Sequence, residues 1–117
     1  MSCLFNSMSY FLKEDSNIIR QKICDYLENN DKIMDGIETK EILSMDSNNY
    51  ISNMRKTSTW GGAIEIQAAC NIWNMSVIVH DIRNKRKDKI NFIPINGNIN
   101  KSINVTWSGG HYEPIRN

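Results

Sequence analysis

The hydrophobic pattern of this chain changes its period at Asn74, and this change constrains the fold more than any other feature. Before Asn74, apolar side chains recur three and four residues apart, as in amphipathic helices; after it, they alternate with polar ones, as in β-strands. Helices followed by strands predict an α+β fold, with a helical N-terminal half packed on a small, mostly antiparallel sheet. Because 117 residues suffice for one hydrophobic core, we expect residues 1–117 to form a single domain.

The N-terminal part contains several segments with helical spacing. A short apolar helix begins near Cys3, and an amphipathic helix with Asn17 as its N-cap follows. Weaker patterns cover residues 38–45 and 47–55, and the best later helix runs from Gly62 to Asn74. The candidate buried side chains are Leu4, Phe5, Met8, Phe11, Leu12, Ile19, Ile23, Tyr26, Leu27, Ile42, Met45, Tyr50, Met54, Ile64, Ala68 and Ile72.

The C-terminal part alternates in the manner of strands. A strand over residues 76–80 is expected to be buried on both faces, and Asn96-Gly97 is a strong turn signal. The basic run over residues 83–89 is expected to be a solvated hairpin tip. The other expected elements are extended segments over residues 90–95, 103–107 and 111–115, and a tight loop at Ser108-Gly109-Gly110.

Composition excludes several classes of protein. The formal net charge of +1 argues against strong, charge-driven binding of nucleic acid. Three widely spaced cysteines support neither a disulfide scaffold nor a zinc site, so we expect no metal or cofactor, and free thiols in a reducing, cytoplasmic compartment. The sequence has neither a secretory signal pattern nor an apolar run near the roughly 20 residues that cross a bilayer. We therefore expect no membrane association.

The residues best suited to catalysis lie at the two ends of the chain. Cys3 stands where a helix begins, and the helix dipole and unpaired amides there favour the nucleophilic thiolate. His111 follows two glycines, and Glu113 points to the same side of an extended chain, where a carboxylate could orient the imidazole. Cys24 and Cys70 are expected to be inert residues within helices, and a structural, hydrogen-bonded role is expected for His80.

These residues resemble the ovarian-tumour (OTU) type cysteine proteases. The resemblance rests on Cys3-Leu4-Phe5, on the block from Trp60-Gly61-Gly62 to Ala68, and on Gly110-His111-Tyr112, in matching order and separation. It implies a papain-like thiol hydrolase that cleaves bonds to the C-terminal glycine of ubiquitin or a ubiquitin-like modifier. Cys3 would match the nucleophile and His111 the general base, and Glu113 falls where many members place the residue that orients the histidine.

The sequence departs from the family pattern before the cysteine. Members usually carry an acidic residue three positions upstream, in a loop whose amides contribute to the oxyanion hole, whereas only Met1 and Ser2 precede Cys3. The amides of Ser2 and Cys3 remain as oxyanion donors, and losing one donor typically costs about 2.7–4 kcal/mol. Three explanations stay open: the chain is an N-terminally truncated form, its activity is impaired by the short N-terminus, or Glu113 replaces the missing acid.

Two rival functions are also consistent with the sequence. A catalytically weak or inactive ubiquitin-binding module would keep the family fold without the complete oxyanion loop. A basic interaction domain would use the run over residues 83–89. The block Trp60-Gly61-Gly62 is expected to be structural, with Trp60 as an apolar anchor beside two glycines that permit close backbone approach. We expect a monomer whose partners are ubiquitin or ubiquitin-like conjugates, acting in the host cytosol if the source is a viral or bacterial effector.

Overall fold

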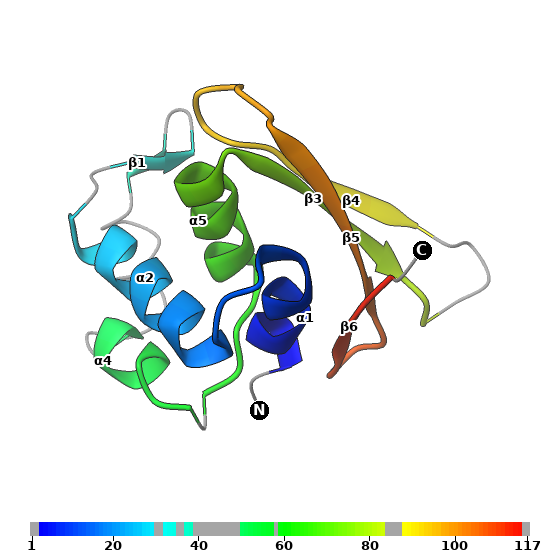
Figure 1. Cartoon of the computed structure of the whole chain (residues 1–117), viewed down its shortest axis with the longest axis horizontal. Helices are drawn as coiled ribbons and strands as arrows, with labels where there is room; N and C mark the ends of the chain where they lie inside the picture. Colours follow the sequence, from blue (N-terminus) through cyan, green and yellow to red (C-terminus); the bar gives the residue numbers. More distant parts are fainter. Residues whose placement is uncertain are drawn as a thin grey trace.

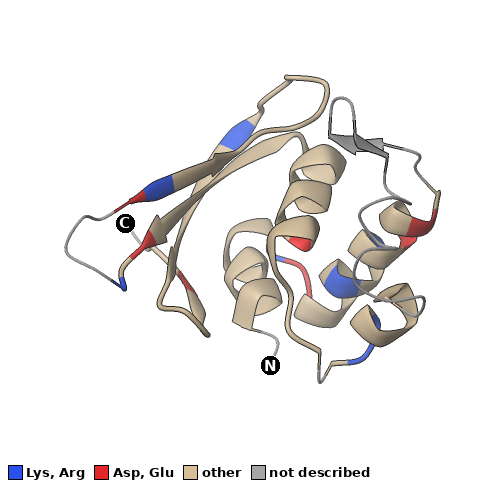
Figure 2. Cartoon of the chain, turned by 180° about the vertical axis from the view of Figure 1, so that it is seen from behind, with Lys and Arg blue, Asp and Glu red and all other residues tan. Residues whose placement is uncertain are grey.

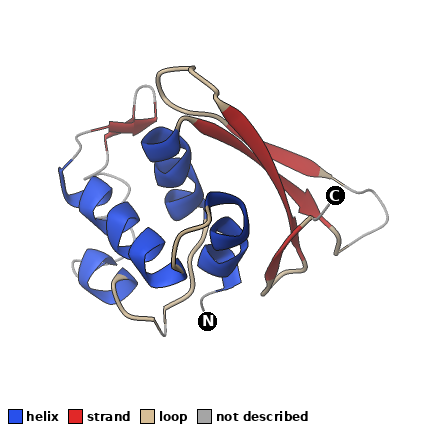
Figure 3. Cartoon of the chain, viewed as in Figure 1, coloured by secondary structure: helices blue, strands red, loops and turns tan. Residues whose placement is uncertain are grey.

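The helices lie on one side of the molecule and a twisted sheet on the other (Figures 1 and 3). The computed structural model describes residues 3–29, 32–34, 37–38, 50–57, 59–83 and 88–115. Its elements are α1 (Cys3–Leu12), α2 (Ser16–Asn29), β1 (Lys32–Met34), β2 (Ile37–Glu38), α4 (Tyr50–Met54), α5 (Ala63–Trp73), β3 (Met75–Asp81), β4 (Lys89–Phe92), β5 (Lys101–Trp107) and β6 (Tyr112–Pro114). The predicted α+β class is confirmed.

The main sheet is mixed, with strand order β4-β3-β5-β6. Its outer pairs, β3 with β4 and β5 with β6, are antiparallel, whereas the central pair of β3 and β5 is parallel. β3 and β5 are parallel because the chain turns back after β4 and places β5 beside β3, on the side opposite to β4. A 3.0 Å hydrogen bond from the Gly97 amide to the Pro94 carbonyl closes the turn. Gly97 has φ +75, so the predicted turn at Asn96-Gly97 is confirmed, although it connects strands that are not neighbours.

The core lies between the helical layer and the sheet. α1 contacts α2 on one side and β6 on the other, and it buries Leu4, Phe5 and Met8 completely. A Cβ at Gly61 would come within 2.8 Å of a methyl carbon of Leu4, so any larger residue here would require the Leu4 side chain to shift. The predicted stripe of α2 is confirmed for Ile19, Ile23 and Leu27, which are buried, while Tyr26 is partly buried.

The helix ends and the middle of the chain differ from the prediction. The N-cap of α2 is Asp15 instead of Asn17, because the Asp15 carboxylate accepts hydrogen bonds from the amides of residues 17 and 18 at 3.0 and 3.3 Å. The short antiparallel pair of β1 and β2 was not predicted, and it places Glu38 in a strand where a helix was expected. The candidate core residues Ile42 and Met45, and residues 47–49 of the predicted helix over 47–55, lie outside the described residues. α4 covers Tyr50–Met54 within that predicted helix, with Met54 buried.

α5 is buried over more of its circumference than a single stripe. Ala68 is fully buried as predicted, but Ile64 and Ile72 are only partly buried, and Ile66, Ala69 and Cys70 lie in the core. α5 contacts both α2 and the strands β3 and β4, so its buried residues extend over more than one face of the helix. The helix begins after Gly62 and ends at Asn74 in the left-handed conformation, with φ 50.

A buried carboxylate anchors the start of α5. Glu65 is 1% exposed, accepts a 2.7 Å bond from the Gly62 amide and accepts a 2.6 Å bond from the Tyr50 hydroxyl. The buried Arg20 guanidinium lies 4.2 Å from the centre of the Phe5 ring and donates to the Met54 carbonyl at 2.8 Å. Figure 2 shows the acidic position at the start of α5 within the helical layer. Glu65 thus ties α4 to the segment that enters α5.

Glu65→Gln is expected to change how stability depends on pH. Burial raises the pKa of Glu65 above its ordinary value of 4.5, outweighing the hydrogen bonds and Arg20, which lower it. The stabilising contribution of the protonated form is therefore complete below pH 4.5 and is lost as pH rises through the raised pKa. Denaturant titrations between pH 4 and 8 should show the free energy of unfolding of the wild type falling relative to Glu65→Gln. A constant difference would contradict this assignment.

Candidate active site

The structure brings the two ends of the chain to one pocket. Cys3, at the start of α1, and His111, just before β6, both line a pocket of about 320 Å³. The contact between α1 and β6 makes this possible, since it seats the first helix against the last strand (Figure 1). Glu113 lines the same pocket. The three residues singled out from the sequence therefore share one site.

Cys3 is half-buried at the N-terminal end of its helix. Its backbone carbonyl accepts a 2.9 Å hydrogen bond from the hydroxyl of Ser7, which is itself buried. This position gives the sulfur both access to the pocket and the favourable end of the helix dipole. The second candidate oxyanion residue, Ser2, lies outside the described residues.

His111 is held by a tight loop and by Glu113. Its carbonyl accepts a 3.1 Å bond from the Ser108 amide, which closes the loop, and Gly109 has φ +104, a conformation that favours glycine. The Nε2 atom of His111 lies 3.2 Å from Oε1 of Glu113, so Nδ1 is the ring nitrogen that Glu113 does not contact. Both side chains are more than half exposed, so this pair contributes orientation more than stability.

Several residues of the pocket were not singled out from the sequence. Asn6 and Tyr10 lie on α1 beside Cys3, and Pro114 follows Glu113. Residues 3, 6 and 10 are three and four apart, so they share one face of a helix. That spacing was readable once Cys3 had been chosen, and it places an amide and a phenol in the pocket that Cys3 lines.

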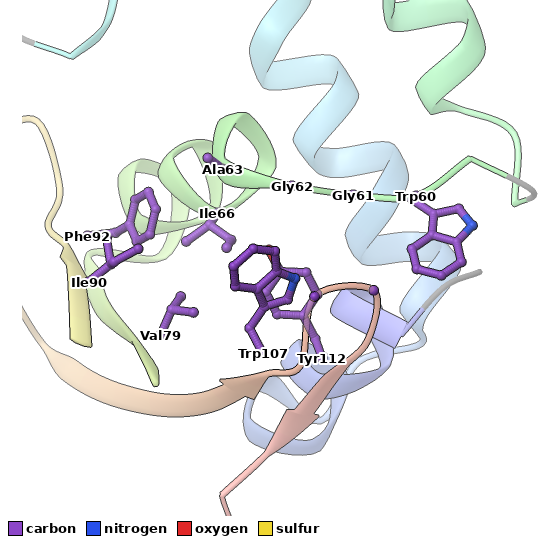
Figure 4. A pocket seen from close by; sticks show the side chains of 12 residues that line it. Trp60, Gly61, Gly62, Ala63, Ile66, Val79, Ile90, Phe92, Trp107 and Tyr112 are labelled. Carbon is purple, nitrogen blue, oxygen red and sulfur yellow. The ribbon is translucent and has the colours of Figure 1, made fainter. Parts of the chain in front are cut away.

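A second, more apolar cavity of about 400 Å³ adjoins the first (Figure 4). Trp60 and Tyr112 line both cavities. Figure 4 shows Trp60 at one end of the second cavity and Ile90 and Phe92 at the other, with the Gly61-Gly62 backbone running towards α5. Its remaining lining residues are Ala63, Ile66, Val79, Trp107, Gly109 and Gly110.

Trp60 does not serve as a buried anchor. Its side chain is 52% exposed, and a Cβ at Gly110 would lie 3.5 Å from its ring. The expectation that Trp60 packs as an apolar anchor is therefore wrong. The close backbone approach in this block is made by Gly61, which lies against α1. The exposed indole instead faces the loop that carries His111.

The other candidate residues have structural environments. Burial raises the pKa of the Cys24 thiol to about 11 and that of Cys70 to about 12, as befits inert thiols. The Nε2 atom of His80 lies 2.9 Å from the side-chain oxygen of Asn104, which confirms the expected hydrogen-bonded role. Arg83 is exposed, as expected for the basic run, and its guanidinium also pairs with Asp81 and lies over Trp107. Residues 84–87 of that run lie outside the described residues.

The part of the chain that the structure describes contains neither a metal-binding cluster nor a membrane-spanning helix. There, no group of three or more His, Cys, Asp or Glu side chains is placed to hold a metal ion. Within the same residues, every helix is too short or too polar to cross a bilayer.

The family of the chain follows from comparison with known sequences. The model of the family described as "OTU-like cysteine protease" matches residues 2–112, which is nearly the whole chain. The chain therefore belongs to the OTU-like cysteine protease family. The block around Gly61-Gly62 and the pair of Cys3 and His111 all fall within the matched range.

Curated relatives and solved structures agree with this membership. The chain is 27% identical over 124 residues to "Ubiquitin thioesterase OTU1" of Drosophila pseudoobscura pseudoobscura, covering 97% of this chain and 31% of that protein. It is 28% identical over 130 residues to "Ubiquitin thioesterase otu2" of Schizosaccharomyces pombe, covering 97% and 42%. The chain thus spans 31% and 42% of the lengths of these two relatives.

Among solved structures, an ovarian tumor (OTU) domain in complex with ubiquitin superposes with a TM-score of 0.76 at 22% identity, covering 97% of this chain and 62% of that chain. The viral OTU domain protease from Dera Ghazi Khan virus superposes with a TM-score of 0.70, also at 22% identity, covering 97% and 72%. At these identities the likeness shows a shared fold.

The three cysteines should differ sharply in reactivity. At pH 7, iodoacetamide should modify Cys3 of the folded protein while Cys24 and Cys70 stay protected. A rise in pKa from 9.0 to about 11 alone lowers the thiolate fraction of Cys24 about 100-fold. Peptide mass spectrometry over a time course measures the three rates. All three should react in denaturant, and modification of Cys24 or Cys70 as fast as Cys3 in the folded protein would contradict the assignment.

Proposed function

We propose that this chain is a cysteine deubiquitinase, a thiol hydrolase that cleaves peptide or isopeptide bonds at the C-terminal glycine of ubiquitin or a ubiquitin-like modifier. The observation that carries the proposal is the shared pocket of Cys3 and His111 in a member of the OTU-like cysteine protease family. The printed names of its relatives, ubiquitin thioesterases, support ubiquitin conjugates as the substrate class. We further propose that residues 1–117 form one catalytic domain, and that it acts as a monomer in a reducing, cytoplasmic compartment.

In the proposed reaction, Nδ1 of His111 takes the proton of the Cys3 thiol, while Glu113 holds Nε2 and so fixes the ring. The thiolate attacks the carbonyl carbon of the terminal glycine, and the backbone amide of Cys3 stabilises the oxyanion. The C–N bond breaks as His111 protonates the leaving amine. A water molecule, deprotonated by His111, then attacks the thioester, and breakage of the C–S bond releases the carboxylate and regenerates the thiol.

The adjoining cavity supports a glycine-terminated tail as the substrate. Gly61, Gly62, Gly109 and Gly110 all line it, and it shares Trp60 with the pocket of Cys3. Glycines on both walls leave a passage through which a tail without side chains reaches the sulfur. We propose that the acyl side of the substrate enters through this cavity and that the leaving amine occupies the pocket of Cys3.

The described surface gives little support to a basic interaction domain. Figure 2 shows acidic and basic positions interspersed over the helices and the sheet of the described residues. Arg83, the first residue of the basic run, has its charge paired with Asp81. Residues 84–87 of the run lie outside the described residues, so the proposed partners, ubiquitin-type conjugates, rest on the shared pocket and the family.

Labelling with an active-site probe tests the proposed nucleophile. Ubiquitin carrying a C-terminal vinyl electrophile should form a covalent adduct with the wild type, and Cys3→Ala should abolish it. Cys24→Ala and Cys70→Ala are matched controls that should still be labelled, because their thiols are buried and not needed. Intact-protein mass spectrometry detects the adduct. Binding of ubiquitin at equal affinity to the wild type and Cys3→Ala, without adduct or hydrolysis, would instead support a non-catalytic binding module.

Glu113→Gln tests the proposed orienting residue. If the carboxylate holds the imidazole in one tautomer, its loss should lower kcat about tenfold or more, because mis-set tautomers are costly. Hydrolysis of a fluorogenic amide at the ubiquitin C-terminus measures kcat and KM. Glu14→Gln, which alters a partly exposed carboxylate paired with Lys22, is the control. Unchanged kinetics in Glu113→Gln would assign the orienting role to another group.

A further inference from the structure

The loop that carries His111 rests on a side chain outside both cavities. Arg83 follows β3, and a Cβ built at Gly109 would lie 3.2 Å from its Cδ atom and 3.8 Å from its Cγ atom. The aliphatic stem of Arg83 is therefore packed against the backbone of the Ser108–His111 loop. This contact involves neither Cys3 nor His111 directly.

Arg83 is itself fixed at two points. Its Nε and Nη2 atoms donate to both carboxylate oxygens of Asp81 at 3.0, 3.2 and 2.7 Å, and its own amide donates to Asp81 at 3.0 Å. Such a two-pronged pairing fixes the guanidinium plane as well as its position. On its other side, the guanidinium carbon lies 4.1 Å from the centre of the Trp107 ring.

Both supports are the last residues of the two central strands, β3 and β5. Asp81 and Trp107 are register partners in the parallel pair of β3 and β5, and the Asp81 side chain is only 8% exposed. The Ile82 amide donates to the Trp107 carbonyl at 3.0 Å, which holds the start of the Arg83 segment to β5. The Trp107 ring also stacks on Tyr112, the residue after His111, with centroids 6.4 Å apart at 27°. The loop is thus held at Gly109 and again at Tyr112.

We propose that Arg83 is a positioning residue: clamped by Asp81 and Trp107, it supports the Ser108–His111 loop and keeps the imidazole aligned with Cys3. This inference rests on the proposed role of His111. Without the clamp, Gly109 and Gly110 leave the loop free to shift, and a misplacement of about 1 Å can cost about 100-fold in rate. The ion pair thus serves alignment of the catalytic ring in addition to stability.

The test compares Arg83→Ala with Arg83→Lys and a matched control. Arg83→Ala should lower kcat for the fluorogenic ubiquitin amide about tenfold or more and change KM less than about twofold. Arg83→Lys keeps an aliphatic stem beside Gly109 and should recover part of the lost rate. Arg55→Ala removes an arginine that pairs with Asp25 and Glu28 at 2.8 and 3.1 Å in the helical layer, and it should leave both constants unchanged.

A second readout does not depend on ubiquitin. The rate of Cys3 alkylation by iodoacetamide, measured against pH, reports how readily the thiolate forms beside the imidazole. The rise in rate should move to higher pH in Arg83→Ala and in His111→Ala, but not in Arg55→Ala. A purely structural role for Arg83 would lower the melting temperature and leave this profile in place.

The outcomes separate the two proposals. Suppose that the pH profile of Cys3 alkylation changes in His111→Ala, whereas Arg83→Ala keeps both the wild-type profile and the wild-type kcat. This result would overturn the positioning role and leave the proposed function intact. If the pH profile shifts in Arg83→Ala but the wild type does not hydrolyse ubiquitin conjugates, the positioning role is supported and the proposed substrate class is overturned. A wild-type profile equal to that of His111→Ala would overturn both.

Discussion

The seating of α1 is the constraint on which the candidate site depends. Leu4, Phe5 and Met8 are fully buried, and burial of such side chains contributes about 1.5–3 kcal/mol each. These contacts fix the axis of α1 between α2 and β6, so its first residue, Cys3, must lie beside the segment that carries His111. The proposed nucleophile, Cys3, and the proposed base, His111, line one pocket because one short helix is held on both sides.

The segment between α4 and α5 links the core to the site. Gly61 approaches α1 so closely that a methyl group would overlap Leu4, and the Gly62 amide donates to the buried Glu65. Trp60, which directly precedes Gly61, is exposed and lines both cavities. A tightly packed strip of backbone thus forms a wall of the proposed substrate channel, and Glu65 connects that wall to α4 through Tyr50.

Sequence patterns predicted much of this arrangement where one local rule decides the outcome. The change of period at Asn74, the apolar positions of α1 and α2, and the loop before His111 follow from spacing and glycine placement. The parallel pairing of β3 and β5 could not be predicted this way, because it depends on where the chain returns after β4. The environments of Trp60 and Arg83 depend on residues that are distant in sequence, Gly110 for Trp60 and Trp107 with Gly109 for Arg83. Position and spacing already made Cys3, His111 and Glu113 available as a catalytic set, and the family resemblance supported the pairing of Cys3 with His111.

The separation of the Cys3 sulfur from the imidazole of His111 tests the central claim most directly. A crystal structure of the reduced protein gives this distance together with the position of the Glu113 carboxylate. We expect the sulfur within about 4 Å of Nδ1, close enough for proton transfer after small adjustment, with Glu113 on the opposite nitrogen. A sulfur and a ring that face different sides of the molecule would contradict the proposed hydrolase.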